Sequence, residues 1–185
     1  MSEMTVLPEV LVIEPQVFQD ARGWFSESYS VRNLKLLGIE DVFVQDNHSF
    51  SAKKGVIRGL HYQRPPMDQA KLVRCTAGSV LDVAVDVRHG SPRYGRWFGV
   101  ILSAENKKQL YIPRGFAHGF LTLEDGCEVQ YKVDNFYSAE HDRGIRYDDR
   151  DIGVEWNVDV PLLSDKDGRL PYLKDCDRDF VWRKP

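Results

Sequence analysis

The stretch of sequence that decides the fold is Lys71-Leu72-Val73-Arg74-Cys75-Thr76-Ala77-Gly78-Ser79-Val80-Leu81-Asp82-Val83-Ala84-Val85-Asp86-Val87. It holds two short runs rich in valine, Lys71–Ala77 and 80–87, and the Ala77-Gly78 pair between them suits a tight turn. Similar runs recur along the chain, at 10–13, 24–29, 56–63, Trp97–Ser103, 109–113, 116–123 and Cys127–Val133. Strands spaced in this way are typical of an antiparallel sandwich or barrel. The sequence therefore predicts a mainly β fold.

The rest of the chain adds little helix and no second domain. One helix is predicted over 31–37, where Ser30 serves as its N-cap and Gly38 ends it. Beyond Asp148 the sequence becomes acidic and irregular, so we expect loops that lie on the barrel. A chain of 185 residues has the length of one domain, and we assign 1–185 to a single unit.

Composition excludes several classes of protein. The chain has 25 basic and 28 acidic residues, a net charge of −3, so it lacks the basic excess that binds a nucleic acid backbone. No apolar stretch is long enough for a membrane helix, and the start, Met1-Ser2-Glu3-Met4, does not resemble a secretory signal. Three widely spaced cysteines predict isolated reduced thiols. We expect a cytoplasmic protein.

Three side chains stand out because of where strand alternation places them. Tyr131 falls on the same face as Val129 and Val133, although a buried tyrosine is also an ordinary core residue. Lys71 opens an apolar run, and a lysine inside a barrel is costly unless it is paired or meets an anion. His61 lies within a predicted strand, and although a lone histidine is often structural, it can act as a base near neutral pH.

Arg58 and His61 fall on opposite faces of a regular strand. They can share a site only if the strand is kinked or bulged between them, and Gly59 permits such an irregularity.

The segment Pro113-Arg114-Gly115-Phe116-Ala117-His118 resembles the second sequence motif of the cupins, which fold as antiparallel β-barrels of the jelly-roll type. The first cupin motif supplies an HxH pair for a metal, and this pair is missing from the sequence. We therefore expect a cupin-type barrel with a few short helices and without a metal or other cofactor.

The chain as a whole resembles the dTDP-4-dehydrorhamnose 3,5-epimerases. The matching segments run nearly from end to end, at 20–23 with Phe25 and Glu27, 44–49, 56–63, 70–74, 82–86, 102–107, 115–120 and 164–167. The resemblance implies an isomerase that converts dTDP-4-dehydro-6-deoxy-D-glucose to dTDP-4-dehydro-L-rhamnose. The resemblance places this reaction in dTDP-L-rhamnose biosynthesis and implies an association with the O antigen of lipopolysaccharide, although it leaves the final glycan open.

The resemblance also implies roles for the unusual side chains. Epimerisation removes protons at C3 and C5, beside the C4 ketone, and requires a base, an acid on the other ring face and a cation for the enolate. By resemblance His61 is the base, Asp167 orients it, Lys71 stabilises the enolate and Tyr131 returns a proton. Tyr137 matches an aromatic residue that stacks near C5 of the sugar, though a core role for Tyr137 stays open.

Substrate-binding residues are implied in the same way. The expected set is Arg22, Glu27, Gln45, Asp46, Asn47, Arg58, Lys71, His118, Tyr137, Asp142 and Lys166. Asp142 departs from the family pattern, in which a glutamate is expected. The family's segment with Arg22 and Glu27 reaches the site of a neighbouring subunit, which implies a homodimer.

Three other functions remain open from the sequence. The first is a 3- or 5-mono-epimerase that acts on a related nucleotide-linked 4-keto-6-deoxy sugar. The second is a metal-dependent cupin enzyme, against which the missing HxH pair speaks. The third is a cupin that binds a nucleotide sugar without catalysis, which would have no need of both an acid and a base.

Overall fold

The computed structural model describes residues 7–184, so the first four residues, and with them the prediction about a secretory signal, lie outside the described part. The elements in chain order are β1 (Leu11–Ile13), β2 (Val17–Asp20), β3 (Gly23–Ser26), α1 (Val31–Leu36), β4 (Gln45–Ser51), β5 (Ile57–Gln63), β6 (Lys71–Ala77), β7 (Ser79–Asp86), β8 (Arg88–His89), β9 (Trp97–Ser103), β10 (Gln109–Ile112), β11 (Phe116–Thr122), β12 (Cys127–Val133), β13 (Asp142–Gly144), the 3₁₀ helices η1 (Asp167–Arg169) and η2 (Leu173–Asp175), and β14 (Phe180–Val181).

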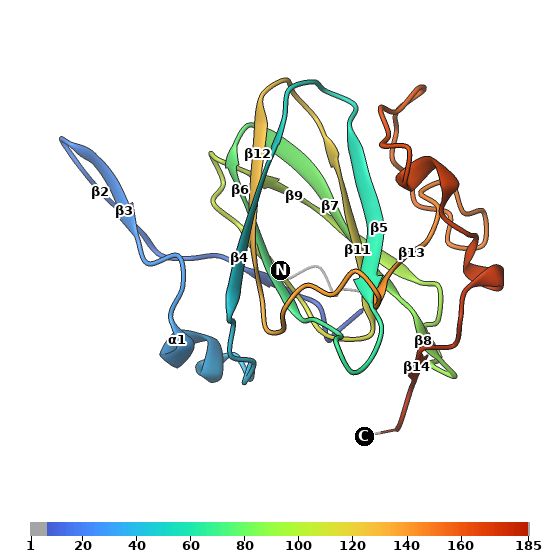
Figure 1. Cartoon of the computed structure of the whole chain (residues 1–185). Helices are drawn as coiled ribbons and strands as arrows, with labels where there is room; N and C mark the ends of the chain where they lie inside the picture. The colour runs from blue at the N-terminus through green and yellow to red at the C-terminus, as the bar shows by residue number, and fades with distance from the viewer. Residues whose placement is uncertain (1–6, 185) are drawn as a thin grey trace.

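Two five-stranded antiparallel sheets form the body of the molecule (Figure 1). The first has the order β1-β10-β6-β12-β4, and the second has the order β13-β5-β11-β7-β9. The hairpin of β2 and β3 projects away from this body, and the segment after β13 covers the opposite side (Figure 1). The prediction of a mainly β, cupin-type barrel with a few short helices is confirmed.

Strand β7 explains why the sheets pack in this way. Its residues alternate between two apolar environments: Val80 and Ala84 belong to the core between the sheets, whereas Val83 and Val85 pack beneath the C-terminal segment. Both faces are buried, which is why this strand is an almost continuous apolar run in the sequence. The core between the sheets also contains Val73, Leu102, Leu110, Phe116, Phe120 and Val129.

The outer face of the second sheet is covered by the irregular C-terminal segment. Ile145, Ile152, Trp156 and Leu173 are buried against it. The acidic region beyond Asp148 therefore lies on the barrel and shares its core, as the sequence predicts. Within residues 7–184, no helix is long and apolar enough to cross a membrane.

Helix α1 begins and ends where the sequence places it. The Ser30 side chain accepts a hydrogen bond from the backbone N–H of Asn33, and Gly38 has a φ of 80°, which glycine adopts readily. Leu34 packs with Ile39 and Leu72 on the outer face of the first sheet. The three cysteines are free thiols, as predicted.

Several strands differ from the prediction. The stretch expected over 24–29 ends as a strand at Ser26 and pairs with β2, which the pattern does not mark. Strand β4 was also missed, because it carries polar residues at nearly every position and so lacks an apolar face. The short strands β8, β13 and β14 have two or three residues each, too few to give a periodic signal.

Two glycines allow β5 and β11 to approach each other closely. A Cβ at Gly59 would lie 2.6 Å from Gly119 Cα, and a Cβ at Gly119 would lie 2.8 Å from the Arg58 carbonyl oxygen. Gly59 has a φ of 125°, and the pairing of the two strands shifts register between His118 and Phe120. The expected irregularity at Gly59 is confirmed, and Arg58 and His61 line the same cavity.

We predict that Gly119→Ala destabilises the protein by about 1 to 3 kcal/mol, because the added methyl group collides with backbone atoms that cannot move independently. Gly168→Ala is the matched control, since a Cβ there meets no atom within 4 Å and its φ is not positive. Urea unfolding of both variants measures the difference. Equal free energies of unfolding for the two variants would contradict the steric role of Gly119.

Candidate active site

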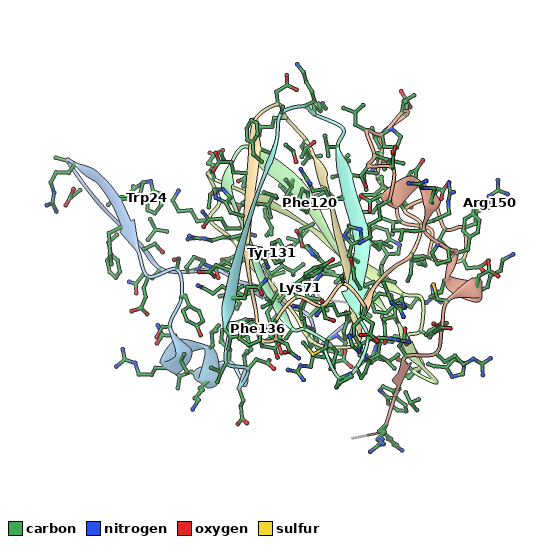
Figure 2. All side chains as sticks on the ribbon, viewed as in Figure 1. Trp24, Lys71, Phe120, Tyr131, Phe136 and Arg150 are labelled. Atoms are coloured by element: carbon green, nitrogen blue, oxygen red, sulfur yellow. The ribbon has the colours of Figure 1, made fainter. Side chains whose placement is uncertain are left out.

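The candidate site is a cavity between the two sheets. Two hollows of about 420 and 270 Å³ share the side chains His61, Lys71, Tyr131 and Lys166 in their walls. Lys71 and Tyr131 lie near the middle of the barrel, far from the projecting Trp24 and from Arg150 on the opposite side (Figure 2). The fold thus brings together the four residues expected to be catalytic: His61, Asp167, Lys71 and Tyr131 all line this space.

His61 is held by a carboxylate from the other end of the chain. Its Nε2 lies 2.6 Å from Asp167 Oδ1, and the Asp167 backbone N–H donates to Ser164 Oγ. Burial tends to raise the pKa of the Asp167 carboxyl, but the bonded His61, with Ser164 and Lys166, holds this pKa below its usual value. Asp167 is therefore an anion that fixes the proton on Nε2 and leaves Nδ1 of His61 as the free nitrogen.

Lys71 is buried at the start of β6, with 7% of its surface exposed. Its ammonium donates a hydrogen bond to the His61 carbonyl oxygen at 3.2 Å. Burial lowers the pKa of Lys71 to about 8, against the opposing charges of Asp82 and Asp142. At neutral pH the group is therefore mostly charged and has two further N–H donors for a ligand.

Tyr131 projects from the sheet that faces His61. It lies on β12 in the first sheet, whereas His61 lies on β5 in the second. Burial raises the pKa of the Tyr131 hydroxyl, and the structure records no hydrogen bond from it to a described residue. Tyr131 is only partly buried and its side chain lines the cavity, so its hydroxyl is available to a ligand there.

His118 and Asp82 form a buried pair at the inner wall of the cavity. His118 stands opposite His61 in the pairing of β11 with β5, and its Nε2 lies 3.0 Å from Asp82 Oδ2. Burial lowers the pKa of His118, whereas the charge and hydrogen bond of Asp82 act to raise it. His118 was in the expected set, but Asp82 was not given a role. The sequence feature that could have identified Asp82 is a carboxylate between Val80 and Ala84, on the inward face of an otherwise apolar strand.

The mouth of the cavity is lined by polar side chains from four segments. Asp142 Oδ2 accepts hydrogen bonds from Lys166 Nζ and, at 3.3 Å, from the Tyr137 hydroxyl. Gln45 donates to Asn47 Oδ1 at 2.9 Å on the inward face of β4. All five line the smaller hollow or its rim. Tyr137 is 60% exposed, which excludes a role as a core aromatic.

Within one chain, the Asp46 side chain does not reach the cavity of His61. Side chains alternate along β4, so Asp46 points to the outer face of the sheet, where Lys132 binds it. It lines a separate hollow there and not the cavity of His61.

Arg22 and Glu27 also lie away from the cavity of their own chain. Arg22 pairs with Asp20 on the projecting hairpin, and Glu27 accepts a hydrogen bond from Asn33. Within one chain, the structure does not bring these two residues to His61.

Among residues 7–184, no group of three or more His, Cys, Asp or Glu side chains is arranged to hold a metal ion. The chemistry that the described side chains support is proton transfer. His61 offers a basic nitrogen, Tyr131 a weak acid and Lys71 a positive charge between the facing sheets.

Comparison with known proteins gives a consistent result. The family model for dTDP-4-dehydrorhamnose 3,5-epimerase matches residues 4–175. A dTDP-4-dehydrorhamnose 3,5-epimerase from Shigella flexneri is 57% identical over 164 residues, which cover 88% of this chain and 90% of that protein.

Solved structures agree. The epimerase from Legionella pneumophila, in complex with dTDP-4-keto-L-rhamnose, superposes with a TM-score of 0.93 at 44% identity, and the match covers 97% of each chain. The enzyme from Bacillus anthracis, with TDP and pyrophosphate bound, gives a TM-score of 0.88 at 47% identity and covers 91% of this chain and 98% of that one. On fold, site and likeness together, the chain belongs to the dTDP-4-dehydrorhamnose 3,5-epimerase family.

Proposed function

We propose that the protein converts dTDP-4-dehydro-6-deoxy-D-glucose to dTDP-4-dehydro-L-rhamnose by proton exchange at C3 and C5. The observation that carries this proposal is the placement of a base and an acid on opposite walls of one cavity, His61 on the second sheet and Tyr131 on the first. A sugar ring between the sheets presents one face to each. Removal of a proton from one face and return to the other inverts the carbon.

His61 is the base in this mechanism. Asp167 holds the proton on Nε2, so Nδ1 is the nitrogen that takes the substrate proton. The same carboxylate stabilises the imidazolium that results.

Lys71 stabilises the enolate. When C3 or C5 loses its proton, negative charge gathers on the C4 oxygen, and this charge is larger in the transition state than in the ketone. A buried ammonium interacts with it more strongly than an exposed one would, because water does not screen the pair. Tyr131 then protonates the opposite face, for which its raised pKa keeps the hydroxyl protonated.

The nucleotide is bound at the rim. The exposed guanidinium of Arg58, already oriented by Ser51 Oγ and the Phe50 carbonyl, suits a phosphate oxygen. His118 lies deeper, at the inner wall of the same hollow, and is proposed to contact the substrate from there. Tyr137 stacks on the ligand near C5 of the sugar, with Asp142 and Lys166 beside it. We place this reaction in the cytoplasm.

The protein is proposed to act as a homodimer through the β2–β3 hairpin. Phe18, Trp24 and Phe25 on this hairpin are 53%, 58% and 68% exposed, and a two-stranded hairpin is only marginally stable in water. Strand β4 is at the edge of its sheet, so one side of its backbone is available for pairing. A second copy on this surface would bring Arg22 and Glu27 to the other chain's cavity.

Incubation of the substrate in heavy water, followed by mass spectrometry and proton NMR, tests the reaction. The wild-type enzyme is expected to introduce deuterium at both C3 and C5, and His61→Ala to slow both exchanges by about a hundredfold or more. A mono-epimerase would label only one carbon.

Tyr131→Phe serves as the companion variant, since it removes only the hydroxyl on the opposite wall. It should still allow His61 to exchange a proton while net inversion fails. Normal inversion at both carbons in Tyr131→Phe would remove the proposed acid from the mechanism.

The pH dependence of kcat tests Lys71. Because the ammonium is the active form and its pKa is about 8, the rate should fall as the pH rises through about 8. A lysine with its ordinary pKa, near 10.4, would keep the rate constant up to higher pH. Lys71→Met should lower kcat by about a hundredfold or more, and its kcat should not show the fall near pH 8. A step at the same pH in Lys71→Met would assign it to another group.

Sedimentation velocity tests the dimer. The wild-type protein should sediment with twice the mass of one chain, and Phe25→Asp should shift it to the monomer because a charge in an apolar interface lacks a partner. Val160→Asp is the control, since Val160 is 80% exposed on the C-terminal segment. A monomeric wild type, or a dimer that survives Phe25→Asp unchanged, would refute this interface.

A further inference from the structure

The loop that carries Tyr137 has no regular secondary structure. It follows β12, and residues 134–141 belong to neither a helix nor a strand. Phe136 and Tyr137 are each 60% exposed, so burial of their rings does not hold the loop in place. Something else must fix the position of Tyr137, because a ring that stacks on a ligand has to be placed with little freedom.

The side chain of Gln63 forms hydrogen bonds with the peptide groups on both sides of Tyr137. Its Nε2 donates to the carbonyl oxygen of Phe136 at 3.1 Å, and its Oε1 accepts from the backbone N–H of Ser138 at 2.6 Å. These are the peptide groups directly before and after Tyr137. The second amide hydrogen is bound by the Met67 carbonyl oxygen, so both donors of the amide are in use.

Other contacts of Tyr137 are longer. Its backbone N–H lies 3.3 Å from Gln45 Oε1, and its hydroxyl lies 3.3 Å from Asp142 Oδ2. Gln69 donates to the Asn135 carbonyl oxygen, but this bond is two residues away from the ring. Gln63 therefore makes the shortest bond to the peptide groups at Tyr137, and it does so from a side chain that is only 4% exposed.

Gln63 also connects this loop to the base. It is the last residue of β5, two positions after His61, and both side chains line the smaller hollow. The strand that fixes the base thus also fixes the stacking residue, and the distance between the two is set by one rigid element of the sheet.

We propose that Gln63 is a positioning residue that holds Tyr137 over the sugar and thereby favours exchange at C5. This inference rests on the proposed function, in which Tyr137 lies near C5. Gln63 makes no recorded bond to His61, Lys71 or Tyr131, whereas two of its bonds flank Tyr137, so a change at Gln63 is expected to act through Tyr137.

A double-mutant cycle with Gln63→Met and Tyr137→Ala tests the proposal. Methionine keeps the length of glutamine but removes its hydrogen bonds to Phe136, Ser138 and Met67. We expect Gln63→Met to lower deuterium incorporation at C5 by about tenfold or more, with a smaller loss at C3 and dTDP affinity within about twofold. In the Tyr137→Ala background, Gln63→Met should change C5 incorporation by less than about twofold.

The control is Tyr111→Phe, which removes a hydrogen bond from a buried side chain outside the cavity, that from the Tyr111 hydroxyl to Asp41 Oδ2. It should leave the ratio of C5 to C3 exchange unchanged. If Gln63→Met does not fold, Gln63→Glu takes its place in the same cycle, since it keeps an acceptor for Ser138 but presents oxygens to two carbonyl groups.

Three results would overturn the inference in different ways. If the effects of the Gln63 and Tyr137 changes multiply in the double variant, Gln63 acts elsewhere while the proposed reaction stands. If Tyr137→Ala exchanges both carbons at the wild-type rate, the role of Tyr137 in the proposed function fails, and the inference fails with it. A wild-type ratio of C5 to C3 exchange in Gln63→Glu would show that the two donated bonds are not needed.

Discussion

The hydrogen bond between His61 and Asp167 joins residues that are 106 positions apart, and the rest of the site depends on it. Asp167 reaches the imidazole only because the irregular C-terminal segment is packed on the second sheet through residues such as Trp156 and Leu173. The segment is therefore more than a cover for apolar surface. Its packing energy maintains a carboxylate in contact with the ring, and without it the imidazole would have no fixed tautomer.

The interior of the barrel is unusual because it contains charge. Lys71, Asp82 and His118 are each at most 7% exposed, and burial works against the charged form of every one of them. The charge of Asp82 stabilises the ammonium of Lys71, and His118 donates a hydrogen bond to Asp82. Such an arrangement gives little net stability. In the proposed mechanism, its benefit is a preorganised field at the place where the enolate oxygen develops.

Many of the strands could be predicted from the sequence, and the polar strand β4 shows why others could not. The strands Lys71–Ala77, Trp97–Ser103 and Cys127–Val133 agree with their predicted bounds because one or both faces are apolar. Strand β4 could not be found by this signal, since its inward residues Gln45 and Asn47 line the cavity. A strand that faces a polar site loses the alternation by which strands are detected.

The residues of the site also fall into two groups, those that a local sequence pattern predicts and those that it does not. Strand alternation gave the inward position of Tyr131 and Lys71, and the glycine at 59 gave the irregularity that unites Arg58 with His61. Asp167 came from family resemblance alone, because no local pattern predicts contact across 106 positions. The same resemblance placed Asp46 in the set, although its side chain lies on the outer face. The contact of Gly59 with Gly119 has a further consequence for engineering. The close approach of β5 and β11 leaves no space for a side chain at either glycine, so a change of sugar specificity has to be built elsewhere, for example at Tyr137, which lies on a loop at the mouth of the cavity.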